Sequence, residues 1–99
     1  MAGFFSRLFG TEEKPDFKAL LESGAMLLDV RTKEEFRQGS ASKSVNIPLD
    51  SLNGNLSKIK KGKPVIVVCA SGARSSSAVS LLKSKGYAEV YNGGSWFRF

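Results

Sequence analysis

The chain carries one cysteine, Cys69, and the residues around it are able to hold that sulfur as a reactive anion. The sequence contains no histidine, so Ser-His-Asp and Cys-His catalysis are excluded within this chain. A structural zinc site needs several Cys or His ligands, and no metal is therefore expected. A nucleophilic Cys69 must be activated by its backbone surroundings or by a nearby cation.

Cys69 stands between the most clearly predicted strand of the chain and a predicted helix. The strand covers residues 64–68, which hold a consecutive β-branched run. The helix covers residues 75–85 and follows a tight loop. Ligands of open α/β sheets bind at the carboxyl ends of the strands, where the next helix directs its free N–H groups and positive dipole end. Gly72 allows the loop to curl, so that successive amides converge on an anion.

Such a ring of amides favours the thiolate form of Cys69. A free thiol has a pKa of about 8.5, which helix N-termini and nearby cations lower by roughly one to several units. The same ring suits the negative charge of a persulfide. Arg74 ends the loop, and we expect its planar guanidinium to contact an incoming oxyanion. Ser75 is expected to cap and solvate the start of the helix, with donation to the sulfur as the alternative. The alternative for Cys69 itself is an inert buried thiol, because cysteine is among the most buried residue types.

Length and composition indicate a single globular domain. The chain has 99 residues, of which 41% are hydrophobic and 24% are charged, and these shares argue against disorder. The net charge of +6 is typical of a solvated surface, and the alternative is attraction of small anions. The lysines around position 60 have no interleaved aromatic residue, so no nucleic-acid partner is expected.

Residues 1–14 are predicted to form an amphipathic segment ahead of a domain that spans residues 15–99. Apolar side chains recur in this segment at helical spacing: Phe4, Phe5, Leu8 and Phe9. We expect the segment to dock on the domain, and the alternative is a weak contact of residues 1–10 with a membrane surface or a partner. The segment lacks the core and the cleavage site of a signal peptide, which together with the free thiol predicts a cytoplasmic location.

Strands are predicted to alternate with helices along the domain. Strands are expected over residues 25–30, 44–47, 64–68 and 88–91, and Asn92-Gly93-Gly94 follows the last of them. Helices are expected over residues 15–23, from Thr32 to near Gly39, and over 75–85, while 49–59 is helical or irregular. Thr32 and Glu35 form a T-x-x-E capping box, in which each side chain satisfies the free backbone N–H of the other residue. This alternation predicts an α/β fold with a mostly parallel sheet.

Three parts of the sequence together resemble the rhodanese family. The run from Leu28 to Phe36, followed by Asn46-Ile47-Pro48, looks like the N-terminal signature of that family. The loop from Cys69 to Ser75 looks like its active-site loop. Gly93-Gly94 with Trp96 resembles its closing motif. The combination is far more specific than any of its parts.

The resemblance implies a doubly wound parallel sheet of about four to five strands with helices on both faces. It also implies transfer of sulfane sulfur from thiosulfate or a protein persulfide, through a persulfide on Cys69, to a thiol or cyanide. No cofactor is implied. The implied cradle around the sulfur consists of Ala70, Ser71, Gly72, Ala73, Arg74 and Ser75.

Three further residues of these motifs are expected to support the fold. Asp29 and Arg31 are predicted to be a structural pair, because a carboxylate and a guanidinium at a strand end can tie loops together. Arg31 could alternatively line the entrance of the pocket. Trp96 is expected to be a core or lid aromatic. Members of the family usually add a helix after this point, so the aromatic end of this chain is expected to cover part of the sheet with Trp96, Phe97 and Phe99.

The length of the loop separates sulfur chemistry from phosphate chemistry. Four residues lie between Cys69 and Arg74, whereas phosphatase-like relatives carry a longer loop whose wider ring fits a phosphate. The sequence therefore favours a sulfurtransferase. Two alternatives remain open: a non-enzymatic persulfide carrier or regulatory module served by a protein partner, and a small cysteine phosphatase or arsenate reductase. Gly39-Ser40 stands where the family often has Gly-His, which is expected to alter local packing rather than the chemistry.

Overall fold

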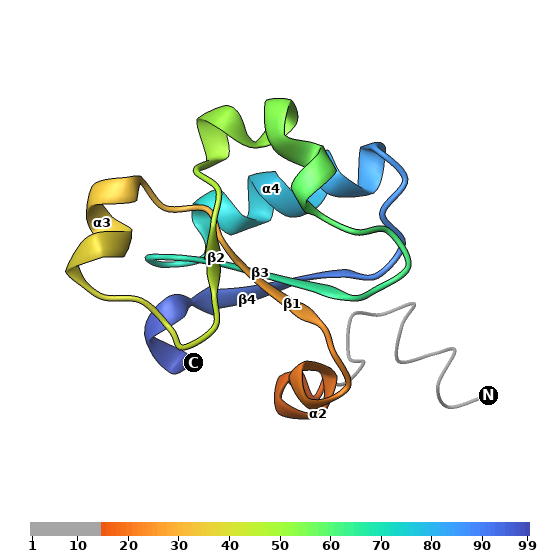
Figure 1. Cartoon of the computed structure of the whole chain (residues 1–99), viewed down its shortest axis with the longest axis horizontal. Coiled ribbons are helices and arrows are strands. Elements are labelled where there is room, and N and C mark those ends of the chain that lie inside the picture. The colour runs from red at the N-terminus through yellow and green to blue at the C-terminus, as the bar shows by residue number, and fades with distance from the viewer. Residues whose placement is uncertain (1–14) are drawn as a thin grey trace.

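The computed structural model describes residues 15–99, which form a parallel sheet of four strands covered by helices on both faces (Figure 1). The sheet contains β1 (Met26–Asp29), β2 (Val45–Asn46), β3 (Val65–Cys69) and β4 (Val90–Ser95) in the spatial order β2-β1-β3-β4. All neighbouring strands run parallel. The predicted α/β fold with a parallel sheet is therefore confirmed. The segment predicted over residues 1–14 lies outside the described residues.

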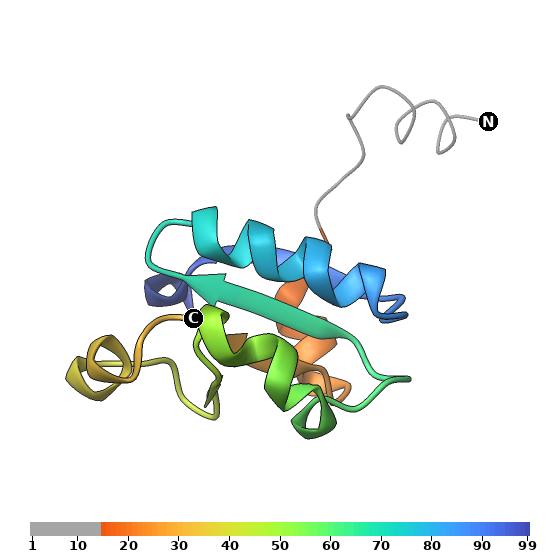
Figure 2. The same cartoon turned by 90° about the horizontal axis from the view of Figure 1, so that it is seen from above.

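Helices connect these strands and cover the sheet. The α-helices of the described part are α2 (Phe17–Glu22), α3 (Lys33–Gln38) and α4 (Ala73–Ser84), and the 3-10 helices are η1 (Leu49–Lys58) and η2 (Trp96–Arg98). α4 and η1 pack on one face, and α2 and η2 on the other (Figure 1 and Figure 2). Within residues 15–99, no helix has the length and apolar character needed to span a membrane.

The central strand β3 is buried along its whole length because both of its faces are covered. Val65 and Val67 belong to the core cluster under α4 and η1. Ile66 and Val68 belong to the smaller cluster on the side of α2 and η2. A consecutive β-branched run is the pattern expected of a central parallel strand. β3 thus delivers Cys69 to the edge of the sheet where α4 begins.

Local chemistry sets the start of two helices that flank the site. At α3 the capping box is confirmed: the Thr32 N–H donates to Glu35 Oε1 at 3.0 Å, and the Glu35 N–H donates to Thr32 Oγ1 at 3.2 Å. α4 begins at Ala73 rather than at the predicted Ser75. Gly72 has a φ of +107°, which turns the chain directly from the loop into the helix.

The last strand differs from the expected range of 88–91, because β4 begins at Val90, takes in residues 92–94 and continues to Ser95. The pairing of β4 with β3 shifts in register within this segment, which keeps the longer strand in the sheet. Gly93 is buried in the sheet, and a Cβ at this position would lie 2.9 Å from both the Ile66 and the Val68 side chains. Glycine is therefore needed at position 93 for close packing.

The aromatic end of the chain covers the second face of the sheet together with α2. Trp96 and Phe99 pack against the cluster that contains Ile66. The ring centroids of Phe99 and Phe17 are 5.7 Å apart. Phe97 remains 80% exposed. The predicted cover is thus confirmed for Trp96 and Phe99 and is wrong for Phe97.

Candidate active site

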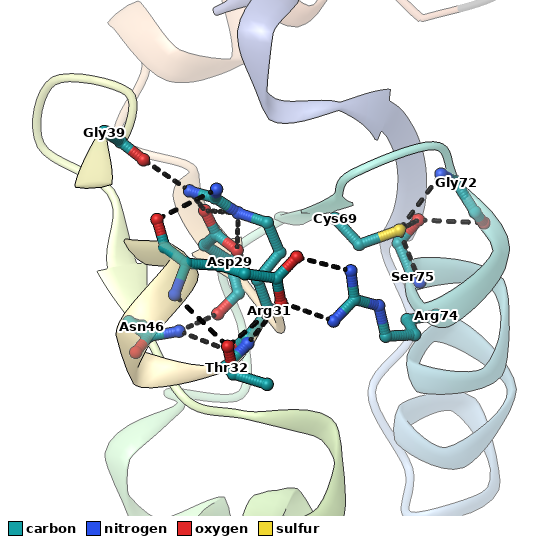
Figure 3. A network of polar contacts seen from close by, with 10 residues as sticks. Asp29, Arg31, Thr32, Gly39, Asn46, Cys69, Gly72, Arg74 and Ser75 are labelled. Carbon is teal, nitrogen blue, oxygen red and sulfur yellow. Dashed lines mark hydrogen bonds and ion pairs between the residues drawn. The ribbon is translucent and has the colours of Figure 1, made fainter. Parts of the chain in front are cut away.

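Cys69 ends β3, and the loop that follows wraps around its sulfur (Figure 3). The side chain is 1% exposed. Two backbone amides donate to Sγ, the Gly72 N–H at 3.0 Å and the Ser75 N–H at 3.4 Å. The thiol is buried, yet it lies on polar donors at the N-terminus of α4 and not only among apolar side chains. This arrangement can stabilise negative charge on the sulfur.

The Ser75 hydroxyl is a further polar neighbour of the sulfur, at 3.6 Å from Sγ. Ser75 is fully buried and its Oγ lies 2.6 Å from Asn92 Oδ1. Asn92 also donates from Nδ2 to the Gly72 carbonyl at 3.0 Å and accepts from the Gly94 N–H at 2.9 Å. The side chain of Asn92 therefore ties the end of β4 to the loop that carries Cys69.

These contacts act on the pKa of the Cys69 thiol in opposite directions. Burial alone raises the pKa, because it disfavours the charged thiolate. The Ser75 hydroxyl and the backbone amides of Ser75, Gly72 and Ser71 lower it, and together they outweigh burial. The pKa of Cys69 is therefore held below its ordinary value. A lowered pKa increases the thiolate fraction near neutral pH, and the thiolate is the nucleophilic form.

Arg74, at the end of the loop, is engaged in a bidentate ion pair with Glu35 of α3 (Figure 3). Its Nη1 lies 2.7 Å from Glu35 Oε1 and its Nη2 lies 3.0 Å from Oε2. The guanidinium of Arg74 and the Thr32 backbone N–H lower the pKa of Glu35 to about 2. The same pair raises the pKa of Arg74. The cation that was expected to meet an oxyanion is thus partly neutralised by a neighbouring carboxylate.

A cavity of about 530 Å³ adjoins the loop on the side of α3 and η1. Its wall is mostly apolar, and Arg74 is the residue that it shares with the loop. It is lined by Val30, Thr32, Lys33, Pro48, Leu49, Asp50, Ser51 and Arg74. A smaller and more polar pocket of about 310 Å³ lies between the loop, β4 and η2, with Ser71, Gly72 and Arg98 in its wall. The loop is therefore bordered by a cavity on each of two sides.

The family model for the rhodanese-like domain matches residues 13–96. This chain belongs to the rhodanese-like domain family. It is 41% identical over 91 residues to Thiosulfate sulfurtransferase 18 of Arabidopsis thaliana, covering 78% of this chain and 67% of that relative. It is 36% identical over 75 residues to Thiosulfate sulfurtransferase GlpE of Pseudomonas savastanoi, covering 76% of this chain and 71% of the relative. These relatives support a rhodanese-type sulfurtransferase.

Solved structures confirm the fold of this rhodanese-like domain. Reduced Bacillus anthracis CoADR-RHD matches with a TM-score of 0.75 and 35% identity, over 84% of this chain and 15% of that chain. A rhodanese with anions from E. coli matches with a TM-score of 0.71 and 28% identity, over 77% of this chain and 92% of that chain. The likeness covers the sheet and its flanking helices.

Asp29 and Arg31 of the rhodanese-like domain form a buried pair beside α3 (Figure 3). Asp29 is 0% exposed and Arg31 is 4% exposed. Arg31 Nη2 donates to Asp29 Oδ2 and to the Gly39 carbonyl, both at 2.8 Å. The guanidinium also lies 4.3 Å from the centroid of the Trp96 ring. All of these contacts hold Arg31 to other parts of the fold. Arg31 lines neither of the two cavities described above.

Two residues at the site of the rhodanese-like domain have roles that sequence reasoning missed. It assigns Glu35 only to the capping box and places Asn92 after the last strand without a role. Nothing local indicates that Glu35 pairs with Arg74, which lies 39 residues away in the chain. For Asn92 a signal exists, because parallel strands place their carboxyl ends at one edge of the sheet. The predicted loop residues Ala70, Ser71 and Ala73 are exposed around the buried sulfur.

Proposed function

We propose that this rhodanese-like domain transfers sulfane sulfur through a persulfide on Cys69. The observation that carries the proposal is the sulfur of Cys69 lying on the Gly72 and Ser75 amides at the N-terminus of α4. The lowered pKa of the thiol supports it, because the attacking species is a thiolate. The names of the relatives described above support thiosulfate as a donor.

The first half of the reaction loads the sulfur. The Cys69 thiolate attacks the outer sulfur of thiosulfate, and a new S–S bond forms while the S–S bond of thiosulfate breaks. Its electron pair leaves with sulfite, and the outer sulfur remains on Cys69 as a persulfide anion. A protein persulfide serves in the same way, with a thiolate in place of sulfite as the leaving group. No further oxidant or reductant is needed.

The second half of the reaction unloads the sulfur. An acceptor thiolate, or cyanide, attacks the terminal sulfur of the persulfide. The bond between Cys69 Sγ and that sulfur breaks, and its electron pair returns to Cys69 as thiolate. The amides that favour the thiolate before loading also favour it as the leaving group here, since a more stable thiolate leaves faster. We place this reaction in a reducing cytoplasm, because it requires Cys69 as a free thiol.

Intact-protein mass spectrometry after incubation with thiosulfate tests the proposal. We expect a gain of one sulfur atom that cyanide reverses, and no gain in the Cys69→Ser variant. Ser80→Ala is a matched control, because it alters an exposed serine of α4 outside the loop. Absence of any gain, with both thiosulfate and a persulfide donor, contradicts sulfur transfer.

Two alternative activities predict different results in parallel assays of the same protein. A persulfide carrier served by a partner takes sulfur from a protein persulfide but turns over negligibly with thiosulfate and cyanide. A cysteine phosphatase or arsenate reductase shows Cys69-dependent activity on an aryl phosphate or on arsenate. The loop of four residues between Cys69 and Arg74 favours a sulfur atom over a tetrahedral phosphoryl group.

A further inference from the structure

The loop around Cys69 has one charged side chain, Arg74, because its other members are alanine, serine and glycine. A free guanidinium there would attract small anions to the loop. In this structure both of its outer nitrogens are bound by Glu35, at 2.7 and 3.0 Å. The charge of the loop is therefore controlled by a residue that belongs to a different helix.

Glu35 is fixed in this role by more than its contact with Arg74. Its Oε1 also accepts from the Thr32 N–H at 3.0 Å and lies 3.1 Å from Thr32 Oγ1, so the capping box orients the carboxylate. Its pKa of about 2 keeps it ionised near neutral pH. Arg74 therefore faces a charged carboxylate near neutral pH.

The charge on Arg74 matters to Cys69 and to the adjoining cavity. A thiolate on Cys69 contributes to the raised pKa of Arg74, so the two charges act on one another. Arg74 is also part of the wall of the 530 Å³ cavity, which is otherwise mostly apolar. The remaining charges of that wall, Lys33 and Asp50, are opposite in sign. With Glu35 in place, the cavity beside the loop has little net attraction for a dianion.

We propose that Glu35 is a specificity-determining residue. By binding Arg74, it weakens the binding of small dianionic donors such as thiosulfate at the loop, and so favours donors without net charge. Glu35 acts through Arg74 and is a positioning residue. The inference rests on the proposed sulfur transfer and names the class of donor. It also explains why a net charge of +6 need not produce strong binding of small anions at the sulfur.

The variant Glu35→Gln separates charge from structure. Glutamine keeps the capping box, because Gln replaces Glu at this position of the motif. Its neutral amide leaves the charge of Arg74 uncompensated. Glu34→Gln is the matched control, since it removes the same charge one residue away from an exposed side chain of the same helix. Thermal unfolding of both variants verifies that each is folded.

Sulfate serves as a dianion that binds without reacting, and the NMR shifts of the loop amides report on it at constant ionic strength. We expect sulfate to bind roughly two- to fivefold more tightly to Glu35→Gln than to the wild type, the range of a partly exposed ion pair. The control Glu34→Gln should match the wild type. The double variant Glu35→Gln/Arg74→Gln should lose the gain. An equal gain in both single variants, or none in either, overturns the proposal.

Kinetics extend the test to the donor itself. The KM for thiosulfate should fall by about the same two- to fivefold factor in Glu35→Gln, with kcat little changed. The KM for cysteamine persulfide, which has no net charge, should stay the same. A parallel fall for both donors contradicts the proposal. The sulfate titration requires no sulfur transfer, so failure of the proposed reaction and failure of this inference are distinguishable.

Discussion

Removing the Ser75 hydroxyl should raise the pKa of Cys69 and leave the loop in place. Ser75 Oγ lies 3.6 Å from the sulfur, and it is the largest of the contacts that lower the pKa of this thiol. Ser75→Ala retains the Ser75 and Gly72 amides on the sulfur. Asn92 Oδ1 keeps its bond from the Gly94 N–H at 2.9 Å, so no buried acceptor is left without a partner.

The size of the effect follows from the geometry. A hydrogen bond to a charged group contributes about 1.5–3 kcal/mol when its geometry is good. This one is longer, and the hydroxyl also lies 2.6 Å from Asn92 Oδ1, which competes for its single proton. We therefore expect this hydrogen bond to stabilise the thiolate by roughly half of 1.5 kcal/mol up to 1.5 kcal/mol. Its loss corresponds to a rise of about 0.5–1 unit in the pKa of Cys69.

The sign is fixed by the chemistry of an acid. A donor that stabilises the thiolate lowers the pKa, so its removal moves the titration of Cys69 to higher pH. Below both pKa values, the thiolate fraction should fall roughly three- to tenfold, as a rise of 0.5–1 unit requires. Loading of sulfur from thiosulfate should slow over that pH range by a smaller factor, because a thiolate of higher pKa is intrinsically the stronger nucleophile.

The ultraviolet absorbance of the thiolate measures this pKa directly. Cys69 is the one cysteine of the chain, so the thiolate signal belongs to a single residue. Ser76→Ala is the control, because Ser76 is exposed one residue further along the same helix. An unchanged or lower midpoint in Ser75→Ala refutes the reasoning, because the backbone amides alone would then hold the charge.

Three further predictions concern stability. Gly93→Ala should lower the free energy of unfolding by about 1–3 kcal/mol in urea, since a Cβ there overpacks the core, and Gly54→Ala, with nothing within 4 Å, is its control. Asp29→Asn should cost about 3–5 kcal/mol in the same assay, because it leaves the buried Arg31 cation without its carboxylate. The pKa of Glu35 is lowered from 4.5 to about 2, so its contribution is present above the higher value and is lost as the pH falls towards the lower one. The stability difference between the wild type and Glu35→Gln should therefore shrink on acidification across that window, and a constant difference contradicts the assignment.

The parts of the fold that sequence predicts are those that local rules decide. The apolar run at 64–68 predicts a central strand because few other arrangements bury every face of such a segment. Thr32 and Glu35 predict the start of α3 because the capping box involves residues within one turn. The position of Cys69 at the edge of the sheet then follows from the strand that precedes it and the helix that follows it.

The errors occur where packing between distant segments decides the outcome. Residues 92–94 lie beyond the strand expected at 88–91, yet they pair with β3 in the sheet, and the absence of a side chain at Gly93 allows Ile66 and Val68 to approach. Once this segment is a strand, Asn92 faces the loop of Cys69 and braces it. Local propensity does not predict this strand, because the segment that pairs with it and stabilises it, β3, lies elsewhere in the chain.

Glu35 shows how one side chain can satisfy a local rule and still hold a second role. Its Oε1 closes the capping box and also meets Arg74, while its Oε2 is directed at Arg74 alone. A carboxylate has enough acceptor capacity for both tasks, so the first role gives no sign of the second. The sequence therefore predicts where α3 begins but not that the same residue sets the charge beside Cys69. The start of a helix and the electrostatics of the sulfur site are, in this chain, properties of one carboxylate.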